Sequence, residues 1–202
     1  MSELERRVAE LETELAAARG DENAVADVLA RLGSNLEAIG QRNCAVLGLK
    51  EAIAIRERLD DPVGLADCLN RLGAVLETLC RFDEARHVLE RALVVARTAG
   101  DRASEATALN NLGLVDEATG KLDLARDRYS ASIAFLRELG DRAKLASTLN
   151  NLGVVHARAG QDELALVTYS EALALHQLEE SRDGSASTLN NMGDIFERRV
   201  SR

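Results

Sequence analysis

The stretch that decides the fold is Leu109-Asn110-Asn111-Leu112-Gly113. The same pattern returns, with few changes, in four other places along the chain, at residues 29–33, 69–73, 149–153 and 189–193. Its glycines stand at positions 33, 73, 113, 153 and 193, so each step is 40 residues. A fixed period between about 20 and 50 residues is typical of proteins built from stacked structural repeats. The sequence therefore predicts one repeat array along most of the 202-residue chain.

The composition of the chain favours helices throughout. Hydrophobic residues make up 46% of the sequence but aromatic residues only 2%, so we expect an aliphatic core. No segment alternates apolar and polar residues with a period of two, as a half-buried strand would. The one proline, Pro62, stands at a predicted turn and interrupts no long helix. Together these features predict an all-α protein.

Apolar residues spaced three and four positions apart predict two helices in each repeat. We expect repeats at about residues 21–60, 61–100, 101–140 and 141–180, within an array that covers 20–202 and ends in a capping helix at 182–200. The paired helices are predicted at residues 20–40, 43–59, 62–79, 83–99, 102–119, 123–139, 142–159 and 163–179. Between them, Gly100-Asp101 and Gly140-Asp141 each combine a helix stop with an N-terminal cap. The unpaired last helix is interpreted either as a polar cap or as a cut through a longer protein.

The first nineteen residues form a separate predicted element. Leu4, Val8, Leu11 and Leu15 are spaced 4, 3 and 4 positions apart, which places them on one stripe of a helix. One interpretation is a helix that caps the first repeat. The other is a short coiled coil that joins two copies of the chain as a homodimer through these four residues.

The charge and the cysteines of the chain exclude several classes of function. A formal net charge of −9 argues against nucleic-acid binding, which needs a basic surface, and against docking on an anionic membrane. No apolar run is long enough for a membrane span, and no secretory signal is recognisable at the N-terminus. The three cysteines, Cys44, Cys68 and Cys80, are expected to be buried free thiols. These features predict a cytoplasmic protein, and the excess of arginine over lysine suggests a bacterial source.

The repeat resembles the tetratricopeptide repeat, a unit of two antiparallel helices. The fourth copy matches that pattern at its large apolar residue, its Leu-Gly pair, its turn glycine and the small and aromatic residues of its second helix: Leu149, Leu152, Gly153, Gly160, Ala165, Tyr169 and Ala172. Other copies depart from it at Ser132, where alanine is usual, and at Cys80, where the turn glycine is usual.

The length of the unit indicates which members of that family it resembles most. At 40 residues, rather than the commoner length of about 34, the unit is similar to the long repeats of kinesin light chains, of Pins-type proteins and of bacterial arrays attached to signalling ATPases and kinases. The resemblance implies a right-handed solenoid of antiparallel helix pairs, with about four full repeats plus terminal helices.

The resemblance also implies a concave groove lined by the first helix of each repeat. The predicted groove residues are Arg31, Asn70, Arg71, Asn110, Asn111, Leu114, Asn150, Asn151, Val154, Asn190, Asn191 and Asp194. An asparagine amide both donates and accepts, so a row of asparagines suits the backbone of an extended peptide. Arg31 and Arg71 are candidates for an acidic group of the ligand, and Asp194 and Glu197 for a basic one. The competing interpretation is that one asparagine of each pair ties neighbouring helices together and binds nothing.

Catalysis finds little support in the sequence. The three histidines are isolated, and no catalytic triad spacing, phosphate-binding loop or metal-ligand motif is present. We therefore predict no catalytic residues, no metal and no cofactor, and a non-catalytic module that binds a protein or peptide partner in its groove. The alternatives are a self-assembling scaffold, and a regulatory or sensor subunit of a bacterial signalling ATPase or kinase system.

Overall fold

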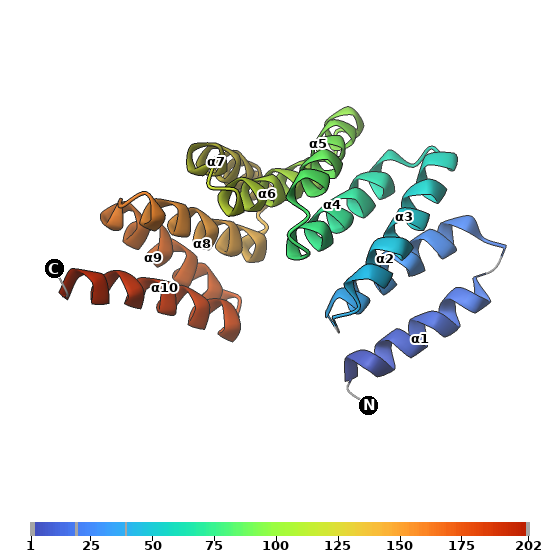
Figure 1. Cartoon of the computed structure of the whole chain (residues 1–202), viewed down its shortest axis with the longest axis horizontal. Coiled ribbons are helices and arrows are strands. Elements are labelled where there is room, and N and C mark those ends of the chain that lie inside the picture. Colours follow the sequence, from blue (N-terminus) through green and yellow to red (C-terminus); the bar gives the residue numbers. More distant parts are fainter. Residues whose placement is uncertain (1–2, 19, 39, 201–202) are drawn as a thin grey trace. The chain divides into compact units, whose positions relative to one another are not determined.

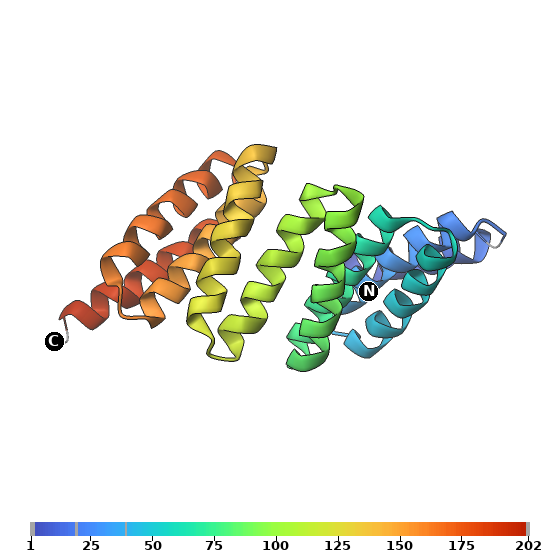
Figure 2. The same ribbon diagram turned by 90° about the horizontal axis from the view of Figure 1, so that it is seen from above.

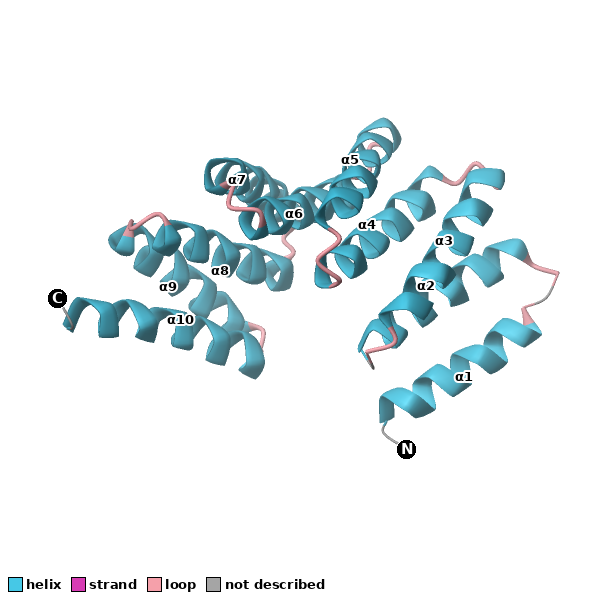
Figure 3. Cartoon of the chain, viewed as in Figure 1, coloured by secondary structure: helices cyan, strands magenta, loops and turns pink. Residues whose placement is uncertain are grey.

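The computed structural model of the chain describes residues 3–18, 20–38 and 40–200. This part of the chain consists of ten α-helices, with no strand among them (Figure 3). The helices are α1 Glu3–Ala17, α2 Glu22–Ala38, α3 Arg42–Arg58, α4 Pro62–Thr78, α5 Phe82–Ala99, α6 Arg102–Ala118, α7 Leu122–Leu139, α8 Arg142–Arg158, α9 Asp162–Leu178 and α10 Arg182–Val200. Each predicted helix is present with ends that differ by at most a few residues, and the all-α fold is confirmed.

Local capping interactions explain where the helices begin and end. The Asp61 carboxylate accepts a hydrogen bond from the Gly64 backbone N–H at 3.0 Å, and Pro62 is the first residue of α4. Asp141 caps α8 in the same way. Cys80 occupies a turn position where the backbone φ is +57°, a region that favours glycine, as the matching Gly120 with φ +77° illustrates. The repeat therefore keeps its turn even where its usual residue is replaced.

The chain divides into two compact units, residues 1–111 and 112–202, with the boundary inside α6. In the first unit α1 packs on α2, α2 on α3, α3 on α4 and α4 on α5, and α2 also contacts α4. In the second unit α7 packs on α8, α8 on α9 and α9 on α10, and α10 also contacts α8. Within each unit consecutive helices lie side by side as antiparallel neighbours (Figures 1 and 2). Stacked helix pairs of this kind are the building principle of an α-solenoid.

The glycine of the repeated box brings the two helices of a pair together. A Cβ atom on Gly73 of α4 would lie 2.3 Å from Cδ2 of Leu89, and one on Gly153 of α8 would lie 2.4 Å from Cε1 of Tyr169. Such distances are far shorter than a van der Waals contact, so the helices approach closely only because the side chain is absent. The predicted packing role of the box glycine is confirmed at these positions.

Gly193 is the exception among the box glycines. A Cβ atom there would meet nothing within 4 Å, because α10 is the last described helix and no second helix covers it. Two apolar side chains of α10, Leu189 and Phe196, are correspondingly about half exposed, at 52% and 51%. The five copies of the box thus have one sequence pattern but two packing environments.

This difference predicts opposite effects for one substitution. Gly73→Ala is expected to lower the free energy of unfolding by about 1–3 kcal/mol, since the new methyl group would overlap Leu89, which is fully buried. Gly193→Ala is expected to leave it unchanged or raise it by about 0.5–1 kcal/mol, because alanine favours helix more than glycine does. Urea unfolding followed by circular dichroism measures both, and equal losses in the two variants would contradict the packing role.

The apolar stripe of α1 lies against the chain itself. Val8 and Leu11 are 8% and 0% exposed, and α1 packs on α2. Leu15 is half-buried, whereas the side chain of Leu4 lies outside the described residues. The Glu14 carboxylate also forms an ion pair with Arg31 of α2 at 2.8 Å. A second chain could contact Leu11 only if α1 separated from α2, so these contacts favour a cap, and homodimer formation stays a prediction.

The cysteines differ from one another in exposure. Cys68 is buried in α4, but Cys44 and Cys80 are exposed, so the expectation that all three are buried was wrong for two of them. Cys44 lies in the first turn of α3, and Cys80 lies in the turn after α4, where neither residue is required to fill a core. Burial raises the pKa of the Cys68 thiol to about 11, and the Asp67 carboxylate adds to the effect.

Thiol reactivity should follow this division. At pH 8 a disulfide reagent such as dithionitrobenzoate is expected to modify Cys44 and Cys80 rapidly and Cys68 slowly, because only thiolates react and Cys68 is both buried and protonated. The Cys44→Ser, Cys80→Ser double variant should therefore lose the rapid phase and regain full reactivity in denaturant. A rapid phase that persists in the double variant would mean that α4 opens readily.

Candidate functional site

The predicted groove residues fall in both units and differ in accessibility. In the first unit Arg31 is exposed, Asn70 is buried, and Arg71, Asn110 and Asn111 are half-buried. In the second unit the half-buried residues are Leu114, Asn150, Asn151, Val154 and Asn191, and the exposed ones are Asn190 and Asp194. Leu114 packs beside the core cluster of Ala125, Tyr129 and Val155. The two sets are described separately, unit by unit.

Asparagines of the first unit hold its helices together. The Asn70 side chain is 3% exposed, and its amide nitrogen donates to the carbonyl oxygen of Ser104 in α6 at 3.0 Å. The Asn111 amide donates in turn to the backbone carbonyl of Asn70 at 3.4 Å, and the Asn110 amide donates to the Asn111 side-chain oxygen at 3.2 Å. In Asn70 the side chain therefore serves packing between α4 and α6, which is the competing interpretation of the sequence.

The two arginines of the first unit are paired within the chain. Arg31 forms its ion pair with Glu14 of α1. Arg71 forms an ion pair with Asp67 at 2.7 Å and donates a hydrogen bond to the Ser34 hydroxyl at 2.8 Å. Both guanidinium groups therefore already have a carboxylate counter-charge within the chain.

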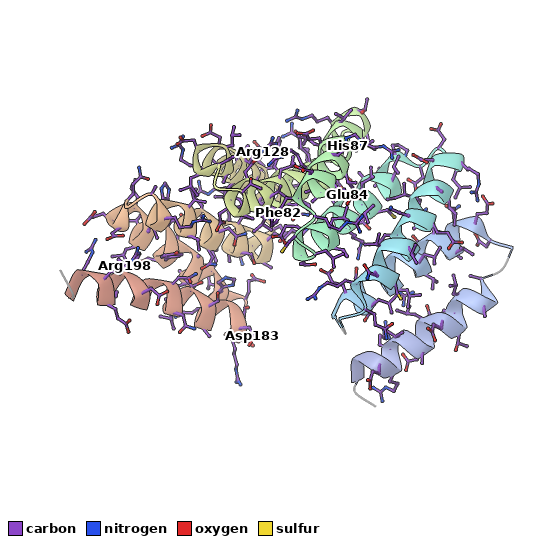
Figure 4. The ribbon with its side chains drawn as sticks, in the orientation of Figure 1. Phe82, Glu84, His87, Arg128, Asp183 and Arg198 are labelled. Atoms are coloured by element: carbon purple, nitrogen blue, oxygen red, sulfur yellow. The ribbon has the colours of Figure 1, made fainter. Side chains whose placement is uncertain are left out.

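The second unit contains a cavity that coincides with part of the predicted groove. Its volume is about 630 Å³, and it lies among α8, α9 and α10, which are neighbours in Figure 1. The residues that line it are Val154, Ala157, Arg158, Tyr169, Asn191, Asp194, Glu197 and Arg198. Three of them were predicted as groove residues, namely Val154, Asn191 and Asp194, and Glu197 was predicted with Asp194 as a candidate partner for a basic group. Arg198 lies toward the C-terminal end of α10, as Figure 4 shows.

Tyr169 of α9 is the most deeply placed residue of this cavity. Its side chain is 1% exposed and packs in a core cluster with Ala165 and Ile195, against which Val154 and Ala157 also pack. No described residue shares a hydrogen bond with its hydroxyl group. Burial is the main cause that raises the pKa of Tyr169 to about 12, so the hydroxyl is protonated at neutral pH.

One repeat earlier, the equivalent tyrosine is fully bonded. The Tyr129 hydroxyl donates to one carboxylate oxygen of Glu117 at 3.1 Å. Arg158 donates to the other carboxylate oxygen at 3.1 Å and to the Glu117 backbone carbonyl at 3.0 Å. The glutamate, contributed by the end of α6, thus closes that position with a side chain of the chain itself.

The residues around Tyr169 can be compared with those that stand 40 positions earlier, around Tyr129. Tyr169 and Arg198 stand where Tyr129 and Arg158 stood, but Ala157 replaces Glu117. The same column of the repeat holds glutamate at positions 37, 77, 117 and 197, so alanine occurs in it only at 157. The cavity is therefore lined by the one repeat position that lacks the carboxylate.

The remaining polar contacts define which atoms of the cavity are already engaged. Arg198 donates from Nε to the Asp194 carbonyl oxygen at 3.3 Å and forms an ion pair with Asp162 at 3.6 Å. The Asn191 amide nitrogen donates to the side-chain oxygen of Asn150 at 3.1 Å, which ties α10 to α8. This hydrogen bond orients the Asn191 side-chain oxygen as an acceptor.

Sequence reasoning missed Tyr169, Ala157, Arg158 and Arg198 as cavity residues. The repeat pattern predicts only a packing role for Tyr169. The signal that could have found the site is the glutamate column interrupted at Ala157, because a missing side chain in a regular array leaves a gap.

A second cavity, of about 270 Å³, lies in the first unit beside the turn from α3 to α4 and contains none of the predicted groove residues. Arg56 on its wall forms ion pairs with Asp27 and Asp61. Within residues 3–18, 20–38 and 40–200, no group of acidic, histidine and cysteine side chains is placed to hold a metal ion. None of the described helices is long and apolar enough to cross a membrane.

Comparison with known proteins agrees with the helical-repeat architecture. A family model described as "Tetratricopeptide repeat" matches residues 64–138 and 144–199. Since these two segments amount to well over half of the chain, the protein belongs to the tetratricopeptide repeat family. A search of curated proteins gave no match.

Several solved structures share the fold at low sequence identity. BtubC (BKLC) from P. vanneervenii is 23% identical, with a TM-score of 0.82 over 98% of this chain and 84% of that one. A Rap protein complexed with Competence and Sporulation Factor is 17% identical, with a TM-score of 0.81 over 94% and 56% of the two chains. The Rap conjugation gene regulator of the plasmid pLS20, solved with the Phr* peptide, is 22% identical, with a TM-score of 0.81 over 90% and 51%.

The two tyrosines should contribute differently to stability. Tyr129→Phe is expected to lower the free energy of unfolding by about 1.5–3 kcal/mol, because it removes a buried hydrogen bond to the Glu117 carboxylate. Tyr169→Phe is expected to change it by less than about 0.5 kcal/mol, because its hydroxyl has no partner to lose. Urea unfolding of this matched pair decides the point, and equal losses would mean that Tyr169 is bonded in solution.

Proposed function

We propose that the protein is a non-catalytic interaction module that holds an extended peptide or a helix of a partner protein in the groove of its second unit. The observation that carries the proposal is that Val154, Asn191 and Asp194 line one cavity in the structure. The repeat pattern of the sequence predicts all three as groove residues, and they come from two different helices, α8 and α10. Its volume of about 630 Å³ lies in the range of about 300–1,000 Å³ that ligand pockets occupy.

The chemistry of the cavity suits part of a polypeptide. Val154 and Ala157 provide an apolar wall, while Asn191 and Tyr169 provide polar atoms a few residues away on neighbouring helices. A side chain of the partner can therefore enter the cavity while its backbone runs along the half-buried Asn150 and Asn151 and the exposed Asn190. Asn110 and Asn111 are the corresponding candidates in the first unit, and Asn70, which is buried, is left out of the proposed row.

The similar structures support this proposal by what they contain. The two Rap proteins were solved as complexes, one with Competence and Sporulation Factor and one with a Phr peptide. Their identity to this chain is low, and they supply the precedent of a ligand-bound fold of this kind rather than a ligand for this protein.

The alternative functions have less support from the structure. Self-assembly through α1 needs an apolar stripe that a second chain can reach, and Val8 and Leu11 are buried against their own chain. Service as a regulatory subunit of a signalling ATPase or kinase is compatible with the proposed groove, which would then hold a segment of that enzyme.

Peptide selection tests the groove directly. Peptides selected from a random twelve-residue display library on the full chain are expected to bind the Val154→Ala and Asn191→Ala variants about five- to tenfold more weakly, because the contacts of two methyl groups are lost in the first and a hydrogen bond in the second. The control is Val167→Ala, which removes the same atoms from a valine of α9 that is 69% exposed and lies outside the cavity. Fluorescence anisotropy measures the affinities of the synthesised peptides.

Two outcomes of this experiment would contradict the groove assignment. Selected peptides that bind both cavity variants as tightly as they bind the original chain, with circular dichroism unchanged, would place their binding site elsewhere. A library that yields no binding peptide above background would contradict the proposal as well.

A further inference from the structure

We infer that the cavity of the second unit receives a basic side chain, lysine or arginine, from the bound partner. This inference rests on the proposed function and adds the chemical class of the group that the groove selects. It is carried by the kind of polar atoms that the cavity leaves without partners.

The first of these atoms is the Tyr169 hydroxyl oxygen. Tyr169 is only 1% exposed, yet it lines the cavity, and no described residue forms a hydrogen bond with its hydroxyl group. The hydroxyl borders the cavity and is not among the buried unpartnered atoms of the described residues, so a ligand in the cavity can bond to it without displacing a protein partner. A hydroxyl oxygen has two lone pairs that can accept hydrogen bonds from an ammonium or guanidinium group.

The other open positions are acceptors too. The Asn191 amide nitrogen already donates to Asn150, which leaves its side-chain oxygen. The Asp194 carboxylate is exposed at the cavity, and no described residue forms an ion pair or hydrogen bond with it. A carboxylate accepts but does not donate, so a partner group that fits these atoms must be rich in donors.

The positive charges of the cavity, by contrast, already have carboxylate partners. Arg158 is bonded to the carbonyl and the carboxylate of Glu117. Arg198 is bonded to the Asp194 carbonyl and paired with Asp162. Each guanidinium thus already has a carboxylate of the chain as its counter-charge, whereas Asp194 forms no ion pair with a described residue, so the uncompensated charge of the cavity is negative.

The net charge around the cavity also favours a basic group. The two guanidinium groups are accompanied by four carboxylates, those of Glu117, Asp162, Asp194 and Glu197, so the group carries a formal charge of −2. The carboxylates of Glu117 and Asp194 both oppose ionisation of Tyr169 and thereby help to raise its pKa, while Arg198 acts in the opposite direction. A positive group at this point is therefore attracted, and a negative one is repelled.

At two matching positions the helix opposite the gap is acidic in this repeat but uncharged in the preceding one, so a carboxylate from a partner would be repelled here. By the 40-residue step, the residues of α8 that correspond to Asp194 and Glu197 of α10 are Val154 and Ala157, both uncharged. In the open site the corresponding residues of α10 are Asp194 and Glu197, so acidic side chains already face the gap from the opposite helix. Val154 and Ala157 now form the wall along which the methylene stem of a lysine or arginine can pack.

Placing charges at position 157 tests the preference of the cavity without any partner. Ala157→Lys, Ala157→Gln and Ala157→Glu introduce side chains of similar helix propensity that reach into the cavity. The lysine variant is expected to melt about 2–4 °C above the glutamine variant, and the glutamate variant below it. A glutamate variant that melts above the glutamine variant while the lysine variant does not would overturn the inference.

A double-mutant cycle separates the cavity from the helix end, because lysine near the C-terminus of α8 is also favoured by the helix dipole. Asp194→Asn is expected to remove the gain of Ala157→Lys. Asp183→Asn, which removes the same charge from the opposite end of α10 (Figure 4), is expected to preserve it. A gain that survives Asp194→Asn would assign it to the helix dipole and overturn the inference.

The selected peptides provide the second test. Changing their basic residue to norleucine should weaken binding to the original chain about tenfold and should have little effect on binding to Asp194→Asn. Peptides that bind the cavity but contain no required lysine or arginine would overturn this inference alone. If no peptide binds the cavity, the proposed function fails, and the position-157 variants still decide the charge preference.

Discussion

The contact on which the structure depends is the seating of a second-helix side chain on a glycine of the first helix. Leu89 lies over Gly73, and Tyr169 lies over Gly153, at distances that leave no room for a Cβ atom. Because this contact recurs at a 40-residue step, each helix pair has the same close geometry and offers the next pair a matching apolar face. Replacing the glycine would therefore affect the stacking of helices as well as one local contact.

The same contact also creates the candidate site. Seating a tyrosine on the box glycine carries its hydroxyl across the first helix to the position that the repeat normally fills with glutamate. At Tyr129 the hydroxyl meets Glu117 and the position is closed, but at Tyr169 the equivalent residue is Ala157 and a cavity results. A binding site thus arises from one exception in a regular array, and the regular copy beside it shows which interaction is missing.

Asparagine illustrates how one residue type can serve both roles in a repeat protein. Asn70 is buried and bonded to α6, whereas Asn191 uses its nitrogen to hold α8 and leaves its oxygen toward the cavity. An amide has both a donor and an acceptor group, so packing with one does not exclude binding with the other. The two interpretations of the asparagine row are therefore compatible within a single side chain.

By itself the sequence determined the repeat, the helices, their caps and the packing role of the box glycines, because these follow from spacing along one chain and from local backbone preference. Of the candidate site it predicted Val154, Asn191, Asp194 and Glu197. Only the tertiary structure decided that Tyr169 and Arg198 join them, that Asn70 is buried, that Cys44 and Cys80 are exposed, and that α1 lies on α2. These features depend on contacts between helices far apart in the sequence, where the same residue type is buried or accessible according to what its neighbour lacks.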